Sequence, residues 1–163
     1  MIREVRRTQA SDIEAVLEIY SHARAFMAAS GNPFQWGDSS PPAEVVMSDA
    51  ESDGYVVVED SQIIGVFYFK VNAYEPAYDY IDGAWISNMP YAVIHRCAVR
   101  DNAKGIGQFI LDWCSSRFSN IRVDTHEDNA PMKNLLSKNG FIRCGKVYYN
   151  KANGERIAFQ KCI

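Results

Sequence analysis

The feature that most constrains this chain is a glycine turn that joins a strand to a helix. Residues 92–99 predict a strand, and a short loop then leads to Gly105-Ile106-Gly107. Apolar residues follow at helical spacing and predict a helix over 105–118. Glycine lets the backbone approach a ligand, and the first helical turn presents unpaired N–H groups at the positive end of the dipole. Such a turn can cradle a pyrophosphate. Two glycines alone would favour the alternative, a glycine-rich turn that holds no ligand.

Spacing excludes two other phosphate-binding turns. A P-loop has Lys-Ser or Lys-Thr after its last glycine, whereas Gly107 is followed by Gln108 and Phe109. A Rossmann fingerprint has Gly or Ala at its sixth position, where this chain has Ile110. It also begins directly after its strand, whereas the first glycine here lies six residues beyond the strand end.

Hydrophobic periodicity elsewhere predicts helices and strands in mixed order. The expected helices span residues 11–28, 41–50, 105–118 and 131–139, and the expected strands span 2–7, 55–59, 63–71, 92–99, 121–126, 141–149 and 156–161. This order indicates an α/β (α+β) fold with a mixed, mostly antiparallel central sheet and helices on both faces. The length of 163 residues suits a single domain over 1–163.

Composition and charge exclude several partner classes. The net charge is -3, so no nucleic acid is expected as the main partner. No apolar run approaches the roughly 20 residues of a membrane helix, and the N-terminus lacks the apolar region of a secretory signal. The four cysteines form no CxxC pair, so we expect free thiols in a reducing cytoplasm. His95, Cys97 and His126 lack the spacing of a metal site, and no metal is expected.

The ordered set of motifs resembles the GNAT superfamily of N-acetyltransferases. The family has [Gln/Arg]-x-x-Gly-x-[Gly/Ala] after a strand that ends in a small residue and Val. Here Cys97-Ala98-Val99 is followed by Asn102-Ala103-Lys104-Gly105-Ile106-Gly107. The family then has a strand, an Asn and a helix that ends near Gly-Phe, and this chain has Asn129 and Gly140-Phe141. The resemblance covers essentially the whole chain and is most specific over residues 92–142.

The resemblance implies acetyl-CoA as co-substrate and an amine as acceptor. It places backbone groups of Cys97 and Val99 along the pantetheine arm, with Asn129 nearby. It places the amides of Ala103, Gly105, Gly107 and Gln108 on the pyrophosphate. The expected cofactor-binding set is Cys97, Ala98, Val99, Asn102, Ala103, Lys104, Gly105, Ile106, Gly107, Gln108 and Asn129. Whether the chain forms a homodimer stays open.

Two positions depart from the family pattern. Asn102 stands where Gln or Arg is usual, and Leu136 stands where many members have a tyrosine beside the leaving sulfur. Tyr148 or Tyr149 could replace that general acid, although tyrosines on a late strand more often serve packing. The sequence therefore predicts direct acetyl transfer to an amine of a small molecule or peptide. The alternative is a non-catalytic acyl-CoA-binding or sensing module of the same fold.

His95 is the candidate general base. A primary ammonium is only about one part in a thousand free amine at neutral pH, so a group that removes its proton is useful. His95 lies two residues before Cys97, and both are expected to face the side where the resemblance places the thioester. The alternative is a hydrogen-bonded core histidine.

Three further residues are candidates for holding the acceptor. Trp36, Glu75 and Trp85 lie in segments that flank the acceptor groove in the family. Aromatic and acidic side chains together suit a cationic amine. The alternative is a solvated loop whose aromatic residues are anchored on the core.

Overall fold

The computed structural model describes residues 2–100 and 103–162. The strands are β1 (Arg3–Arg7), β2 (Gly54–Glu59), β3 (Gln62–Lys70), β4 (Asp82–Gly83), β5 (Ala92–Val99), β6 (Asn120–Thr125), β7 (Ile142–Tyr148) and β8 (Glu155–Cys162). The helices are α1 (Ile13–Ala29), α2 (Ala43–Ala50), α3 (Ile106–Ser115) and α4 (Ala130–Lys138), with 3₁₀ turns η1 (Ala10–Asp12) and η2 (Pro76–Tyr78). None of these helices is both long enough and apolar enough to span a bilayer.

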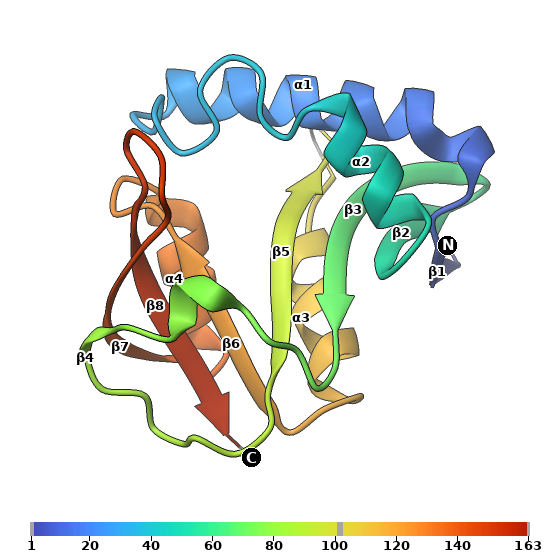
Figure 1. The fold of residues 1–163 in the computed structure, drawn as a ribbon. Helices are drawn as coiled ribbons and strands as arrows, with labels where there is room; N and C mark the ends of the chain where they lie inside the picture. The colour runs from blue at the N-terminus through green and yellow to red at the C-terminus, as the bar shows by residue number, and fades with distance from the viewer. Residues whose placement is uncertain (1, 101–102, 163) are drawn as a thin grey trace.

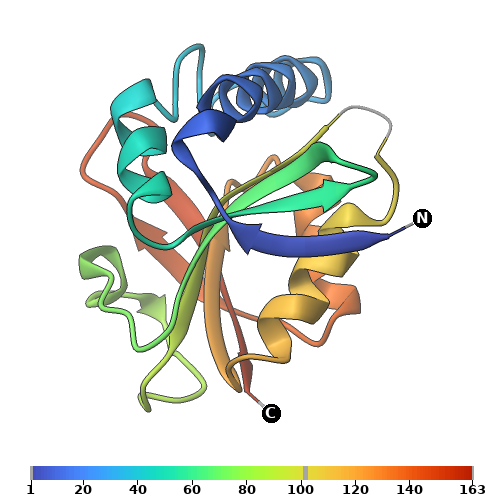
Figure 2. The ribbon, with the colours of Figure 1, turned by 90° about the vertical axis from the view of Figure 1, so that its right-hand side faces the viewer.

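The strands form one mixed sheet in the order β1-β2-β3-β5-β6-β8-β7-β4. Every neighbouring pair is antiparallel except β5 and β6, which run parallel. Helices α1 and α2 cover one face, and α3 and α4 cover the other (Figures 1 and 2). The predicted fold class is therefore confirmed. The two-residue strand β4 was not predicted, because it is too short to show a period and exists only through its pairing with β7.

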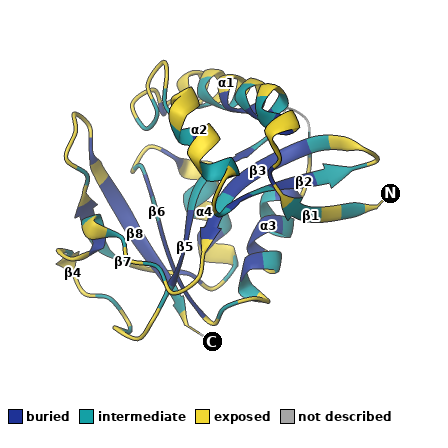
Figure 3. Ribbon diagram, turned by 45° about the vertical axis from the view of Figure 1, so that its right-hand side comes forward, coloured by how far each residue is buried: buried dark blue, intermediate teal, exposed yellow. Residues whose placement is uncertain are grey.

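In the described part of the chain, apolar side chains form three buried clusters, and two of them lie beneath helices on opposite sides of the sheet. The larger core lies beneath α3 and α4 and includes Ile94, Ile110 and Leu136. The smaller core lies beneath α1 and α2 and includes Ile19 and Val66. Buried residues concentrate in the central strands and on the inner faces of the helices (Figure 3). The two cores fix the helices against opposite faces and leave the middle of the sheet as the rigid support of the site.

The parallel strands β5 and β6 separate part of the way along their length. Their register extends only from Ala92 and Ile121 to Ile94 and Val123. Beyond that point β5 stays paired with β3 as far as Val99, whereas β6 stays paired with β8 (Figure 1). The sheet is therefore split at its centre, and backbone groups on the facing edges of the two strands lack their usual ladder partners.

A β-bulge lies just beyond this split. Tyr68 of β3 pairs with His95, and Val66 pairs with Ala98, so two residues of β5 oppose a single residue of β3. The extra residue is Arg96, which has a φ of 49°. Such a left-handed conformation is costly for a residue with a side chain and occurs where surrounding contacts impose it.

Two contacts hold the bulge in place. The Arg96 guanidinium donates to Asp49 of α2 through Nε (2.7 Å) and Nη2 (2.9 Å). The Tyr20 hydroxyl of α1 donates to the Arg96 carbonyl oxygen at 2.6 Å. Because both partners come from helices packed on the sheet, the bulge is a product of tertiary packing.

The bulge corrects one expectation about side-chain direction. We expected His95 and Cys97 to face the same side, as strand alternation requires. The His95 ring instead lies beside Tyr68 and Tyr78, whereas Cys97 packs against the core beneath α3 and α4. The extra residue between them reverses the alternation, so the two side chains approach the split from opposite faces.

Candidate functional site

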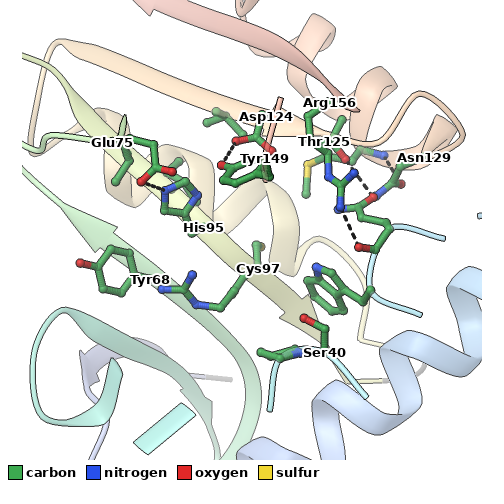
Figure 4. A pocket seen from close by; sticks show the side chains of 18 of the residues that line it. Ser40, Tyr68, Glu75, His95, Cys97, Asp124, Thr125, Asn129, Tyr149 and Arg156 are labelled. Carbon is green, nitrogen blue, oxygen red and sulfur yellow. Dashed lines mark hydrogen bonds and ion pairs between the residues drawn. The ribbon is translucent and has the colours of Figure 1, made fainter. Parts of the chain in front are cut away.

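A cavity of about 460 Å³ lies where β5 and β6 separate. Residues from the α1–α2 loop, β5, β6, α4 and the β7–β8 hairpin line it (Figure 4). A second cavity of about 340 Å³ adjoins it along α1, the end of β5 and the start of α4. Both are lined by Met27, Cys97, Gly107, Asn129, Met132 and Leu135. The two cavities therefore form one groove that runs through the split in the sheet.

The glycine turn forms the part of the groove nearest to α3. Gly105 precedes the helix with a φ of 75°, which glycine adopts without steric cost. A Cβ atom on Gly107 would lie 2.8 Å from Leu135 Cδ2, so this glycine lets α3 pack closely on α4. The first-turn amides of α3 have no partner within the helix and remain available to an anion.

The structure separates the expected cofactor residues into groups. Cys97, Ala98, Val99, Ala103, Gly107 and Asn129 line the groove. The Ile106 side chain is buried in the core instead. The Gln108 side chain bonds to Asp112 and Asn139, and the Lys104 carbonyl accepts from Arg3 at 3.2 Å. Asn102 lies outside the described residues.

Two of the expected ligand contacts are already occupied within the protein. The Ala103 amide donates to the Arg100 carbonyl at 3.1 Å, which removes this amide from the set of free donors. Asn129 caps α4, since its Oδ1 accepts from the Met132 amide at 3.2 Å. Its Nδ2 donates to Gln35 Oε1 at 3.0 Å. The Asn129 side chain thus shapes the wall of the groove through its own hydrogen bonds.

Gln35 organises one end of the cavity and was missed by the sequence analysis. Its Oε1 accepts hydrogen bonds from the Asn32 and Asn129 amides, the Thr125 hydroxyl and the His126 backbone. Its backbone carbonyl accepts from Arg156 Nη2 at 2.8 Å. These bonds tie the α1–α2 loop to β6, α4 and β8. No local pattern could have identified Gln35, because all its partners but Asn32 are distant in the sequence.

His95 stands beside an acidic partner at the other end of the cavity. Its Nε2 lies 3.9 Å from Glu75 Oε2 (Figure 4). Burial lowers the pKa of His95 below its usual value, so the imidazole is neutral at neutral pH. Burial, followed by the nearby charge of Asp124, raises the pKa of Glu75. A neutral imidazole next to a carboxylate can accept a proton from a bound ammonium.

Asp124 occupies the position on β6 that corresponds to His95 on β5. Each follows the last residue paired across the two strands. The hydroxyls of Tyr78 and Tyr149 both donate to Asp124 Oδ2, at 2.7 and 2.6 Å. Burial raises the pKa of Tyr149 far above its usual value. Leu136, at the usual tyrosine position, is fully buried.

The expected acceptor residues are only partly brought together. Trp36 and Glu75 line the cavity, and the Trp36 ring meets Tyr20 edge-on at 5.5 Å. Trp85 does not line it. Its Nε1 donates to the Tyr78 carbonyl at 3.2 Å, and Arg122 lies 4.0 Å from its ring centroid. Trp85 is therefore placed as a packing residue. Among residues 2–100 and 103–162, no three His, Cys, Asp or Glu side chains are grouped so that they could hold a metal ion.

Comparisons with known proteins point to a single fold family. No protein-family model and no curated protein matches the sequence. A GNAT-family acetyltransferase from Streptococcus agalactiae is similar in structure, with a TM-score of 0.88 and 28% identity over 99% of this chain and 95% of that chain.

Two more distant structures were solved with a ligand. The yncA protein of Salmonella typhimurium, with its cofactor acetyl-CoA, has a TM-score of 0.65 and 16% identity over 98% of this chain and 93% of that chain. A GNAT-superfamily phosphinothricin acetyltransferase from Sinorhizobium meliloti, in complex with acetyl-CoA, has a TM-score of 0.67 and 15% identity over 100% of this chain and 89% of that chain. At these identities the likeness concerns the fold alone.

Proposed function

By its fold this chain belongs to the GNAT superfamily of acetyltransferases, and from this premise we propose that it transfers the acetyl group of acetyl-CoA directly to a primary amine. The observation that carries the proposal is the continuous groove through the split between β5 and β6. The groove leads from the glycine turn of α3, past Cys97, to the cavity that holds His95 and Glu75. A long thioester and a small amine could thus meet from opposite ends.

The residues of the groove fit an acyl-CoA. The smaller cavity is lined mainly by apolar side chains, including Ala23 and Met27 of α1 and Met132 of α4. It ends at the α3 N-terminus, where backbone amides and the helix dipole favour a pyrophosphate. Gly105 and Gly107 keep side chains away from this turn. Acetyl-CoA supplies an activated acyl thioester to such a site.

The protein's own contribution is to orient the two reactants and to manage protons. The neutral His95 imidazole takes one proton from the acceptor's ammonium, and Glu75 stabilises the imidazolium that forms. The freed amine nitrogen then bonds to the carbonyl carbon, and the carbon–sulfur bond breaks. The amine nitrogen then loses a second proton, and the departing thiolate accepts a proton to become the free thiol of CoA. The β-bulge at Arg96 supplies backbone N–H groups to a carbonyl oxygen at the split.

Direct transfer also agrees with the state of the thiol in the groove. Burial raises the pKa of Cys97 to about 12, so the side chain stays protonated at neutral pH. A thiol is a poor nucleophile compared with its thiolate. An acetyl-cysteine intermediate at Cys97 is therefore not part of the proposal.

The test measures free thiol released from acetyl-CoA in the presence of a panel of amino acids, polyamines, aminoglycosides and peptides. Thiol release that depends on an amine supports the proposal. Calorimetry in parallel determines whether acetyl-CoA binds. Binding without thiol release for any amine would favour the non-catalytic acyl-CoA-binding module. That alternative rests on the buried Leu136, which stands at the usual position of the tyrosine acid. Absence of acetyl-CoA binding would refute both functions.

A further inference from the structure

Two cationic side chains line the cavity on the side opposite to His95 and Glu75. Arg156 of β8 lies beside Asn129 and Thr125, and His95 and Glu75 lie at the opposite end of the cavity (Figure 4). Lys151, from the β7–β8 hairpin, lines the same cavity. The mechanism proposed above uses neither cation.

Arg156 is buried but has no carboxylate partner. Only 4% of the surface of Arg156 is exposed. Its Nη1 donates to the carbonyls of Asn153 (2.5 Å) and Glu155 (2.9 Å), and its Nη2 donates to the Gln35 carbonyl (2.8 Å). All three acceptors are neutral. Within the described residues no ion pair involves Arg156, so its charge is not matched by direct contact with an acid.

The unused donors of Arg156 have the geometry of an anion site. A guanidinium carries five N–H groups, and the three bonds above leave the Nε–H and one Nη2–H. A carboxylate can accept from neighbouring guanidinium N–H groups with two oxygens at once. A buried charge without a partner is unfavourable, and a ligand anion would remove that penalty.

Lys151 adds a second positive charge to the same wall. Partial burial lowers the pKa of Lys151, and the charge of Arg156 lowers it further. The Lys151 Nζ lies 5.7 Å from the centroid of the Tyr149 ring. The negative charge of Asp124 acts on both Lys151 and Arg156, but Asp124 Oδ2 already accepts two phenol hydroxyls. Two cations thus share one acid, and neither forms an ion pair within the described residues, so this wall of the cavity favours a further anion.

We propose that Arg156 and Lys151 form a carboxylate subsite and that the acceptor is a small amino acid, with its amine toward His95 and Glu75. This inference rests on the proposed acetyl transfer and specifies its substrate class. An acceptor with an ammonium and a carboxylate matches a cavity that has acids at one end and unpaired cations at the other. A polyamine would place positive charge against Arg156, and an aminoglycoside offers no anion to it.

The experiment compares amino acids with their matched carboxamides, using free-thiol release at saturating acetyl-CoA. The two probes differ only in the charged group that Arg156 would bind. A charged carboxylate forms stronger hydrogen bonds to a guanidinium than a neutral carboxamide does. The kcat/KM for the best acid should therefore exceed that for its amide by roughly 10-fold to 100-fold. Calorimetric titration of acid and amide into the complex with CoA should show the same preference without turnover.

Substitutions separate anion binding from the structural bonds of Arg156. Arg156→Gln should reduce the preference for acid over amide to near unity, and most of that change should come from a fall in kcat/KM for the acid. Lys151→Gln, on an exposed hairpin, should fold normally and lower the preference by about twofold to fivefold. The matched control is Arg122→Gln. Arg122 is also buried and donates to a backbone carbonyl at 2.8 Å, but it does not line the cavity. Its substitution should leave the preference unchanged.

The outcomes distinguish failure of the subsite from failure of the proposed function. Equal kcat/KM for acids and amides in wild type would overturn the subsite and leave acetyl transfer intact. A parallel loss for acid and amide in Arg156→Gln would show that Arg156 only supports the hairpin and the α1–α2 loop. If that variant does not fold, Lys151→Gln and the wild-type pair of probes decide. No thiol release with either series would refute the proposed function. The calorimetric titrations of acid and amide would then test the subsite independently of turnover.

Discussion

Replacing His95 with glutamine tests the assignment of the base. The change retains a polar side chain of similar size and removes the ability to accept a proton. A positioned general base contributes about 10²–10⁴-fold to rate, so kcat should fall by that factor, which equals about 2.7–5.4 kcal/mol of barrier. His95 does not line the smaller cavity that leads to the glycine turn, so acetyl-CoA affinity should stay within a few fold of wild type.

The pH dependence gives a second measure of the same role. Burial lowers the pKa of His95 from 6.5, while the charge of Asp124 partly opposes this and Arg96 adds to it. The acid limb of wild-type kcat/KM should therefore lie below pH 6.5. The same sign applies to stability: below pH 6.5 the unfolded chain gains a proton that folded His95 resists. Stability linked to His95 is thus complete above pH 6.5 and is lost as the pH falls through the folded pKa.

Glu75→Gln is the matched control for His95→Gln. Its carboxylate lies 3.9 Å from the imidazole, so removing that charge should lower the pKa of His95 further. The acid limb should move to lower pH with only a modest loss of rate. The measurement is kcat/KM against pH for the three proteins, with folding verified by circular dichroism. Unchanged rates and acid limbs in His95→Gln would remove His95 from the mechanism. A larger loss in Glu75→Gln than in His95→Gln would make Glu75 the base.

Further predictions concern the turn, the packing residues and the thiols. Gly105→Ala should lower the free energy of unfolding by about 1–2 kcal/mol in urea denaturation, because the φ of 75° is costly for alanine, and an unchanged midpoint would contradict this. Trp85→Phe should leave KM for the acceptor unchanged and cost about 0.5–1.5 kcal/mol of stability, since it loses the bond to the Tyr78 carbonyl and keeps an aromatic ring beside Arg122; a raised KM would indicate that Trp85 contributes to the site. Cys162 is exposed and should react first with a thiol reagent at pH 8, whereas Cys97, with a pKa raised to about 12, should react much more slowly in the folded protein. Retained activity in Cys97→Ala would agree with direct transfer, and its abolition in a folded protein would argue against it.

Local sequence was sufficient to predict the elements whose structure depends on residues that are close together in the chain. The helix that opens at Gly105-Ile106-Gly107 could be predicted, because glycine chemistry and a 3.6-residue period act over one or two turns. The predicted end at residue 118 was too late, since α3 ends at Ser115. The Phe118 amide still donates to the Cys114 carbonyl, so the last turn continues without full helical geometry. Element boundaries depend on such terminal bonds, which periodicity does not describe.

Expectations about the site failed where they assumed regular geometry. Strand alternation placed His95 and Cys97 on one side, and the bulge at Arg96 reversed it. Nothing in the sequence around Arg96 marks the bulge, because Asp49 and Tyr20 impose it from two other helices. Aromatic character likewise could not distinguish Trp36, which lines the cavity, from Trp85, which does not.

The sequence by itself determined the α/β class, most of the elements, the glycine turn and the identity of His95 and Glu75 as candidates. Only the tertiary structure decided how these parts meet. The split between β5 and β6, three of the four bonds at Gln35 Oε1 and the bond from Arg156 to the Gln35 carbonyl all involve residues that are far apart in the chain. Hydrophobic periodicity records which face of an element is buried, but it carries no information on which distant polar group lies across a cavity. That pairing arises only when the two cores fix the helices and strands around the groove.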